Sequence, residues 1–200
     1  MTVLDRQLPE MLLERSIPVL ETERLVLRAP RLEDAKIVAA LANDRRIAEN
    51  TLRVPHPYGL ADAQSFLTTA NDSDDETVFL ITVRQDAAVI GACGIARLDG
   101  ETPEIGYWLG VPFWGKGYAT EAAHALVDHA FGDLRYDVLH GGARVSNPAS
   151  RRVLEKCGFQ WTGVGLYRIR AIKSSAPVDR FRLDRRLWAS LKSWGRTALA

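Results

Sequence analysis

The segment 104–131, EIGYWLGVPFWGKGYATEAAHALVDHAF, carries the most informative pattern in this chain. Its first six residues favour a β-strand, and a glycine-rich turn follows at 111–119. The remainder predicts an amphipathic helix, because apolar residues recur on one helical face: Ala119, Ala122, Ala123, Leu126, Val127, Ala130 and Phe131. A strand, a glycine turn and a helix in this order direct free backbone N–H groups and the positive end of the helix dipole toward an anion. We therefore expect a phosphate-binding turn at 115–117.

The sequence of this turn departs from two familiar phosphate-binding motifs. Residues 110–116 match the first seven positions of the nucleoside-triphosphate loop G-x-x-x-x-G-K, but the eighth position requires Ser or Thr and holds Gly117. Pro112 also removes a backbone donor from that loop. A dinucleotide-binding fingerprint requires a third glycine where this chain has Thr120. A tight turn that uses glycine only for its geometry is the remaining structural alternative.

Residues 114–122, WGKGYATEA, resemble the acetyl-CoA pyrophosphate loop of the GNAT N-acetyltransferase superfamily. The closer resemblance is to its RimJ/RimL type, whose loop commonly reads W-G-x-G-Y-A-T-E-A. The wider superfamily has Gln or Arg where this chain has Trp114, a departure that fits the RimJ/RimL branch. A second segment at 147–159, NPASRRVLEKCGF, resembles the family's N-x-x-S-x-x-x-x-x-K-x-G-F pattern and lies downstream, as the family requires.

The resemblance covers roughly residues 23–184 and implies an α/β (α+β) protein with the GNAT fold. In that fold a mixed, mostly antiparallel central sheet has splayed middle strands and flanking helices. Hydrophobic periodicity agrees, since it predicts the order β-α-α-β-β-β-α-β-α-β-β, with a turn at Asp99-Gly100 and a final strand pair around a turn at 173–177. We divide the chain into an N-terminal extension (1–20), the acetyltransferase domain (21–186) and a C-terminal helix or tail (187–200).

The resemblance implies acetyl-CoA as co-substrate, with its pantetheine arm between the strands 104–109 and 138–145. The implied binding residues are Leu109, Val111, Gly115, Lys116, Gly117, Tyr118, Ala119, Thr120 and Asn147. Two of these residues have equally good structural explanations: Lys116 as a solvated surface lysine, and Asn147 as a helix N-cap. Neither the resemblance nor the cysteine pattern, with only Cys93 and Cys157 in separate elements, implies a metal site.

The implied reaction is direct attack of a primary amine on the thioester. Ser150 is the candidate for protonating the departing CoA thiolate, and a hydroxyl serving the helix start is its structural alternative. Glu104 is the candidate for accepting the amine's proton, directly or through water, and a solvent-facing glutamate is the alternative. Tyr58 and Trp108 are the candidate acceptor-pocket residues. The acceptor is a protein N-terminal α-amine as first choice and a small-molecule amine as second.

A formal net charge of +1 gives no electrostatic basis for binding nucleic acid or an anionic membrane. Neither a leader pattern nor a run of 18 apolar residues is present, which favours a cytoplasmic location. Monomer and homodimer both remain open. The rival function is a non-catalytic module that binds acyl-CoA as a sensor or scaffold. Such a module would keep Gly115, Gly117 and Asn147 and would need neither Ser150 nor Glu104.

Overall fold

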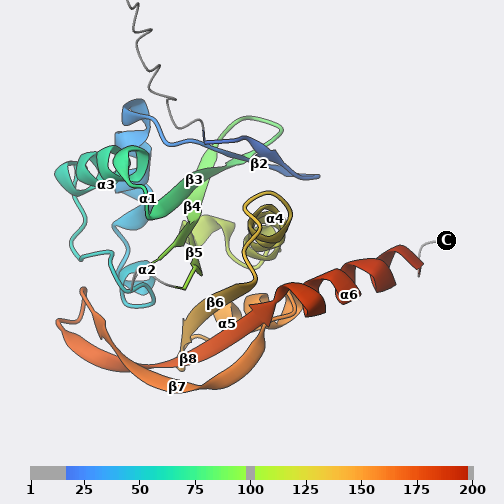
Figure 1. The fold of residues 1–200 in the computed structure, drawn as a ribbon. Helices are drawn as coiled ribbons and strands as arrows, with labels where there is room; N and C mark the ends of the chain where they lie inside the picture. The colour runs from blue at the N-terminus through green and yellow to red at the C-terminus, as the bar shows by residue number, and fades with distance from the viewer. Residues whose placement is uncertain (1–16, 98–101, 198–200) are drawn as a thin grey trace, which may run out of the picture.

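The computed structural model describes residues 17–97 and 102–197. The predicted turn at Asp99-Gly100 and most of the N-terminal extension lie outside the described residues. The described part forms one eight-stranded sheet in the order β1-β2-β3-β4-β5-β6-β8-β7 (Figure 1). The strands are β1 (Leu20–Glu21), β2 (Leu25–Arg28), β3 (Glu76–Val83), β4 (Val89–Ala96), β5 (Glu104–Leu109), β6 (Val138–Arg144), β7 (Gln160–Ile169) and β8 (Ser174–Asp184).

Every neighbouring pair in the sheet is antiparallel except β5 and β6, which run parallel. The helices are α1 (Ala35–Ala42), α2 (Arg45–Ala48), α3 (Leu60–Asp72), α4 (Tyr118–Gly132), α5 (Pro148–Lys156) and α6 (Arg185–Thr197), with short 3-10 turns η1 (Leu32–Asp34) and η2 (Val111–Phe113). This architecture is the mixed, mostly antiparallel sheet with flanking helices that the sequence predicts.

Two hydrophobic clusters lie on opposite faces of the sheet. The larger one joins the apolar face of α4 to the sheet, and Leu126 and Phe131 in it are fully buried. Complete burial of such side chains contributes about 1.5–3 kcal/mol each. The smaller cluster packs α1 and α3 against β3 and β4. Figure 1 shows α4 on one side of the central strands and α1 and α3 on the other.

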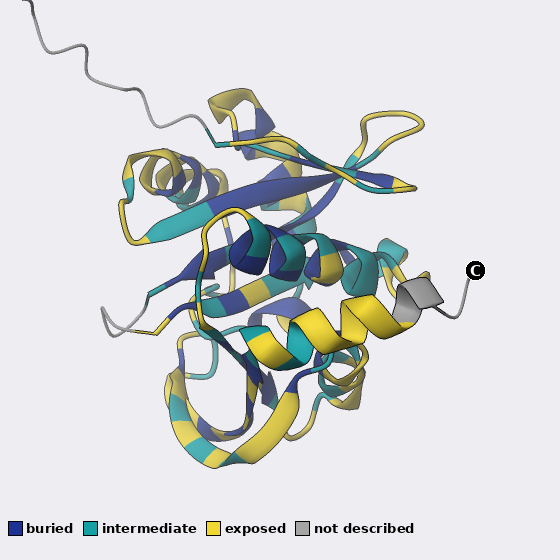
Figure 2. Ribbon diagram, turned by 45° about the vertical axis from the view of Figure 1, so that its right-hand side comes forward, coloured by how far each residue is buried: buried dark blue, intermediate teal, exposed yellow. Residues whose placement is uncertain are grey.

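The C-terminal helix α6 follows directly from β8 and presents a mostly exposed surface (Figure 2). Its first turn is attached to the body, since the Trp188 and Phe131 rings lie 5.3 Å apart and Trp188 Nε1 donates to Asp128 Oδ1 at 2.8 Å. The boundary drawn between residues 186 and 187 therefore falls within the first turn of α6, which begins at Arg185.

The predicted turn at 173–177 is wrong, because β8 already begins at Ser174. Pro177 favoured a turn, yet it lies inside the strand, opposite Leu166 of β7. Its carbonyl points toward β6 and accepts from Val145 N at 3.2 Å, one residue beyond the end of that strand. The N–H that proline lacks would point the same way, so it falls where the ladder with β6 stops.

Candidate active site

The parallel strands β5 and β6 part soon after they meet. Among the described residues they pair at only two positions, Glu104 with His140 and Ile105 with Gly141. On their outer sides both strands remain fully paired, β5 with β4 and β6 with β8. The sheet therefore opens a gap between the C-terminal halves of β5 and β6, as expected for the splayed middle strands. Helix α4 begins after one of these strands and α5 after the other.

The turn before α4 has the backbone geometry of an anion cradle. Gly115 and Gly117 have φ values of 74° and 81°, in the left-handed region that favours glycine. Gly117 is the N-cap residue of α4, and its carbonyl accepts from Glu121 N at 3.1 Å. The N–H groups of Tyr118, Ala119 and Thr120, in the first turn of α4, have no carbonyl acceptor within the helix. They are thus placed at the positive end of the helix dipole.

Three other predicted cofactor residues contribute to this turn in different ways. The Leu109 side chain is buried in the larger core, and its carbonyl accepts from Trp114 Nε1 at 2.8 Å. Only its backbone is therefore placed toward the turn. Val111 is half-buried and begins η2. Lys116 is exposed, with its Nζ 5.7 Å from the centre of the Phe113 ring.

Asn147 and Ser150 lie at the start of α5, across the gap from β5. Asn147 Oδ1 accepts from Ser150 N at 3.1 Å, so the capping role is confirmed. Ser150 Oγ lies 2.9 Å from the Tyr107 hydroxyl, which also donates to the Ser150 carbonyl at 3.1 Å. Burial raises the pKa of Tyr107, with the hydrogen bond to Ser150 opposing it, so the phenol stays protonated at neutral pH. Tyr107 therefore joins β5 to α5.

Tyr107 is a site residue that the sequence prediction missed. Strand alternation places it on the opposite side of β5 from Glu104 and Trp108, the two predicted site residues of this strand. The available signal was its position on the strand that borders the predicted gap, but only the folded structure brings Ser150, 43 residues later, within hydrogen-bonding distance.

A cleft of about 410 Å³ lies on the α1 and α3 side of the sheet. Its lining brings together four predicted site residues, Tyr58, Glu104, Trp108 and Ser150. The lining also includes Phe66, Gly106, Tyr107 and Gly142. A Cβ placed on Gly106 would meet nothing within 4 Å, so the backbone of β5 is open to the cleft between Glu104 and Trp108. The cleft therefore reaches the gap at Tyr107 and Ser150.

The far wall of the cleft comes from the connection between α2 and α3 and from the β7–β8 turn. Tyr58 is 6% exposed, and burial raises the pKa of its hydroxyl to about 12, with Asp62 adding to the shift and Arg170 opposing it. Arg53 and Glu76 form an ion pair on this wall. The Arg170 backbone N donates to the Leu52 carbonyl at 3.0 Å and so ties the two segments together.

The sequence matches the family model described as an acetyltransferase (GNAT) domain over residues 24–160. The chain belongs to this family. It is 33% identical over 150 residues to p20 of Bacillus licheniformis, an uncharacterized N-acetyltransferase, covering 72% of this chain and 84% of the relative. A ribosomal-protein-serine acetyltransferase of Escherichia coli is 33% identical over 84 residues, covering 40% of this chain and 46% of the relative.

Solved structures agree on the fold. A GNAT-family acetyltransferase from Bacillus anthracis superposes with a TM-score of 0.75 at 20% identity, covering 84% of this chain and 99% of the other. With the family and the fold established, the chain is an acetyl-CoA-dependent acetyltransferase, and the predicted resemblance is confirmed. Within residues 17–97 and 102–197, no group of three or more His, Cys, Asp and Glu side chains is placed to hold a metal. No helix among those residues is both long and apolar enough to span a membrane.

Proposed function

We propose that this acetyltransferase transfers the acetyl group of acetyl-CoA to a primary amine by direct attack. The observation that carries the proposal is the meeting of two openings: the gap between β5 and β6 reaches the cleft at Tyr107 and Ser150. Because α4 and the cleft lie on opposite faces of β5, a donor held at the α4 turn would pass through this gap. Its thioester would then arrive beside the acceptor.

The donor would be held at both ends of the gap. The N–H groups from Gly115 to Thr120 would bind its pyrophosphate, with Lys116 adding charge at the rim. The amide of Asn147 would bond the pantetheine arm in addition to capping α5. Glycine at positive φ in both turn positions supports this fit, because a side chain at either residue would be strained.

The polar residues on the acceptor side of the cleft fit an amine, in its cationic or its neutral form. Glu104 and Asn50 line the same cleft, and Asn50 Oδ1 is buried without a hydrogen-bond partner among the described residues. An ammonium group would supply the missing donor. Glu104 would then take one proton from the amine, directly or through water, which leaves the nitrogen lone pair free to attack.

The attack forms the C–N bond and breaks the C–S bond of the thioester. The departing thiolate would receive a proton from Ser150 Oγ, directly or through water, and Ser150 would recover a proton from solvent. The Tyr107 hydroxyl, 2.9 Å from Oγ, would hold Ser150 in position and keep its own proton. The second amine proton returns to solvent. An acetyl-cysteine intermediate is disfavoured, because Cys93, which lines the cleft, is only 3% exposed and burial raises its pKa.

We place a protein N-terminal α-amine first among acceptors and a small-molecule amine second. The name of the Escherichia coli relative, a ribosomal-protein-serine acetyltransferase, supports this order. Tyr58 and Trp108 would contact the acceptor, since both line the cleft. The proposed compartment is the cytoplasm, and both monomer and homodimer are compatible with the site.

The test measures release of the CoA thiol from acetyl-CoA in two separate assays. One assay supplies short peptides with free N-termini as acceptors, and the other supplies polyamines. Ser150→Ala should lower kcat more than it weakens acetyl-CoA binding, and Tyr107→Phe should give a smaller loss of the same kind. Saturable acetyl-CoA binding without thiol release for any amine would favour the non-catalytic module. An unchanged kcat in Ser150→Ala would remove Ser150 from the mechanism.

A further inference from the structure

The turn that begins α4 is held from outside by the segment that leads into β2. Glu121, in the first turn of α4, accepts three hydrogen bonds from that segment. The donors are Thr22 Oγ1 at 2.6 Å, Arg24 N at 2.8 Å and Arg24 Nε at 2.7 Å. The partners lie almost a hundred residues apart in sequence, so the contact fixes α4 against a distant part of the sheet.

Arg24 continues from Glu121 onto the turn itself. Its NH1 donates to the Lys116 carbonyl at 3.0 Å, and its guanidinium carbon lies 4.9 Å from the centre of the Tyr118 ring. Its NH2 lies 3.3 Å from the position that a Cβ on Gly117 would occupy. One side chain therefore contacts Lys116 and Tyr118 of the turn and the carboxylate of Glu121 one helical turn later, and it lies beside Gly117.

The bond to Lys116 has a directional consequence. The carbonyl of Lys116 and the N–H of Gly117 belong to the same planar trans peptide and point in opposite directions. Holding the carbonyl toward Arg24 therefore aims the Gly117 N–H away from Arg24, into the open side of the turn. The ion pair also neutralises Glu121, whose charge would otherwise oppose an anion at this helix end.

We propose that Arg24 is a positioning residue for the donor pyrophosphate: it orients the Gly117 N–H through Lys116 and cancels the charge of Glu121. The proposal rests on the assignment of the 115–120 turn to acetyl-CoA made above. Arg24 acts through the turn and is not itself a catalytic residue. A lysine at this position could not bond Glu121 and Lys116 together, because it lacks the planar fork of donors.

The first measurement is the Kd for acetyl-CoA by calorimetric titration. Arg24→Ala should weaken binding by about 10- to 100-fold, the range expected for losing a charge-assisted contact, and Arg24→Lys should recover only part of it. Arg84→Ala is the matched control, because Arg84 forms an exposed ion pair with Glu21 at 2.9 Å in the neighbouring part of the sheet. An unchanged Kd in Arg24→Ala would overturn the proposal.

The second measurement separates orientation from general loss of structure. The amide resonance of Gly117, followed by heteronuclear NMR, should move downfield when the wild type is saturated with acetyl-CoA. In Arg24→Ala at saturation this movement should be much smaller, while the amide resonances of β3 and β4 stay as in the wild type. A full-sized Gly117 movement in the variant would overturn the proposal.

Two further outcomes are distinguishable from that failure. If Gly117 does not respond in the wild type although acetyl-CoA binds, the assignment of the turn fails, and the role of Arg24 falls with it. If Arg24→Ala does not fold, Arg24→Lys replaces it in the same experiment, because it keeps the charge but cannot bond Glu121 and Lys116 together. The Gly117 movement should be smaller in that variant than in the wild type, and a full-sized movement would overturn the proposal.

Discussion

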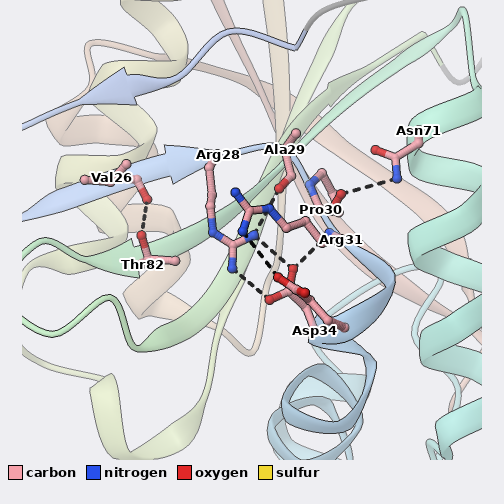
Figure 3. Close-up of polar contacts among 9 residues, drawn as sticks. Val26, Arg28, Ala29, Pro30, Arg31, Asp34, Asn71 and Thr82 are labelled. Carbon is pink, nitrogen blue, oxygen red and sulfur yellow. Dashed lines mark hydrogen bonds and ion pairs between the residues drawn. The ribbon is translucent and has the colours of Figure 1, made fainter.

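Two arginines lie at the two ends of β2, Arg24 just before it and Arg28 as its last residue, and each bonds a carboxylate in a different setting. Arg28 bonds Asp34 at 2.7 and 2.9 Å, and the side chains of this pair are 20% and 8% exposed (Figure 3). The side chains of Arg24 and Glu121 are 45% and 17% exposed. The first pair joins residues six apart and the second joins residues 97 apart. An arginine–carboxylate ion pair thus holds the chain turn from β2 into η1 at one end of the strand and the turn before α4 at the other.

The corner around Asp34 is built mainly from local hydrogen bonds. Asp34 also accepts from Arg31 N at 2.9 Å, and Arg28 NH1 donates to the Ala29 carbonyl (Figure 3). We therefore expect the Arg28–Asp34 pair to stabilise the fold with little influence on the donor, and the Arg24–Glu121 pair to affect donor binding more than stability.

The largest effect should come from Gly117→Trp. The new side chain would require a strained backbone at φ 81° and would fill the turn against Arg24. We expect the Kd for acetyl-CoA to rise by about 1,000-fold, combining backbone strain with lost charge-assisted hydrogen bonds. Calorimetric titration measures it. Gly132→Ala is the control, because a Cβ there meets nothing within 4 Å at the other end of α4. Unchanged affinity in Gly117→Trp would end the assignment of this turn.

Asp34→Ala should act on stability instead. It leaves the largely buried Arg28 without its carboxylate, at an expected cost of about 3 kcal/mol in the free energy of unfolding. Urea unfolding measures this loss, and the folded variant should bind acetyl-CoA like the wild type. Arg31→Ala removes the exposed pair with Glu33 and should cost less than about 1 kcal/mol. A weakened acetyl-CoA affinity in Asp34→Ala would break the division between the two ends of β2.

Acid should weaken both pairs. Burial alone would raise the pKa of Asp34 and of Glu121, but hydrogen bonds from Arg28 and Arg31 to the first, and from Thr22 and Arg24 to the second, outweigh it and lower both values. A carboxylate with a lowered folded-state pKa stabilises the fold above its unfolded pKa and loses that contribution as pH falls through the folded value.

The free energy of unfolding should therefore drop as pH falls below the ordinary values of 3.8 for Asp34 and 4.5 for Glu121. Urea titrations across this range measure the drop, which should be smaller in Asp34→Asn than in the wild type. Equal drops in the two proteins would show that Asp34 does not contribute to acid sensitivity.

The smallest effect should come from Thr22→Val. It removes the hydroxyl that donates to Glu121 and accepts from Leu25 N at 2.9 Å, and it keeps both contacts of Arg24. We expect about a fivefold rise in the Kd for acetyl-CoA, as for the loss of the one hydrogen bond to Glu121. A loss as large as that of Arg24→Ala would mean that the position of Glu121, rather than the guanidinium on Lys116, controls the turn.

Sequence alone predicted those parts of the molecule that depend on neighbouring residues. The glycine-rich turn at 111–119, the strand 104–109 and the Asn147 cap depend on local sequence, and all three were predicted. The wall formed by Arg53, Glu76 and Arg170 could not be predicted, because its members come together only through tertiary packing. The same holds for the bonds of Arg24 to Glu121 and of Tyr107 to Ser150. The turn at 173–177 was predicted wrongly, because the preference of proline for turns does not depend on which edge of a strand is hydrogen-bonded.

The parting of β5 and β6 gives the sheet two inner edges. Beyond Ile105 and Gly141 the facing backbones no longer share a ladder, so a sheet of eight strands behaves there as two sheets joined by a short seam. The pantetheine arm of the donor is extended and carries amide groups, so it would pair with both inner edges as an added strand does. Donor binding should therefore stabilise the contact between the β1–β5 and β6–β7–β8 parts of the sheet. Amide hydrogen exchange at the inner edges should slow far more than in β3 or β4.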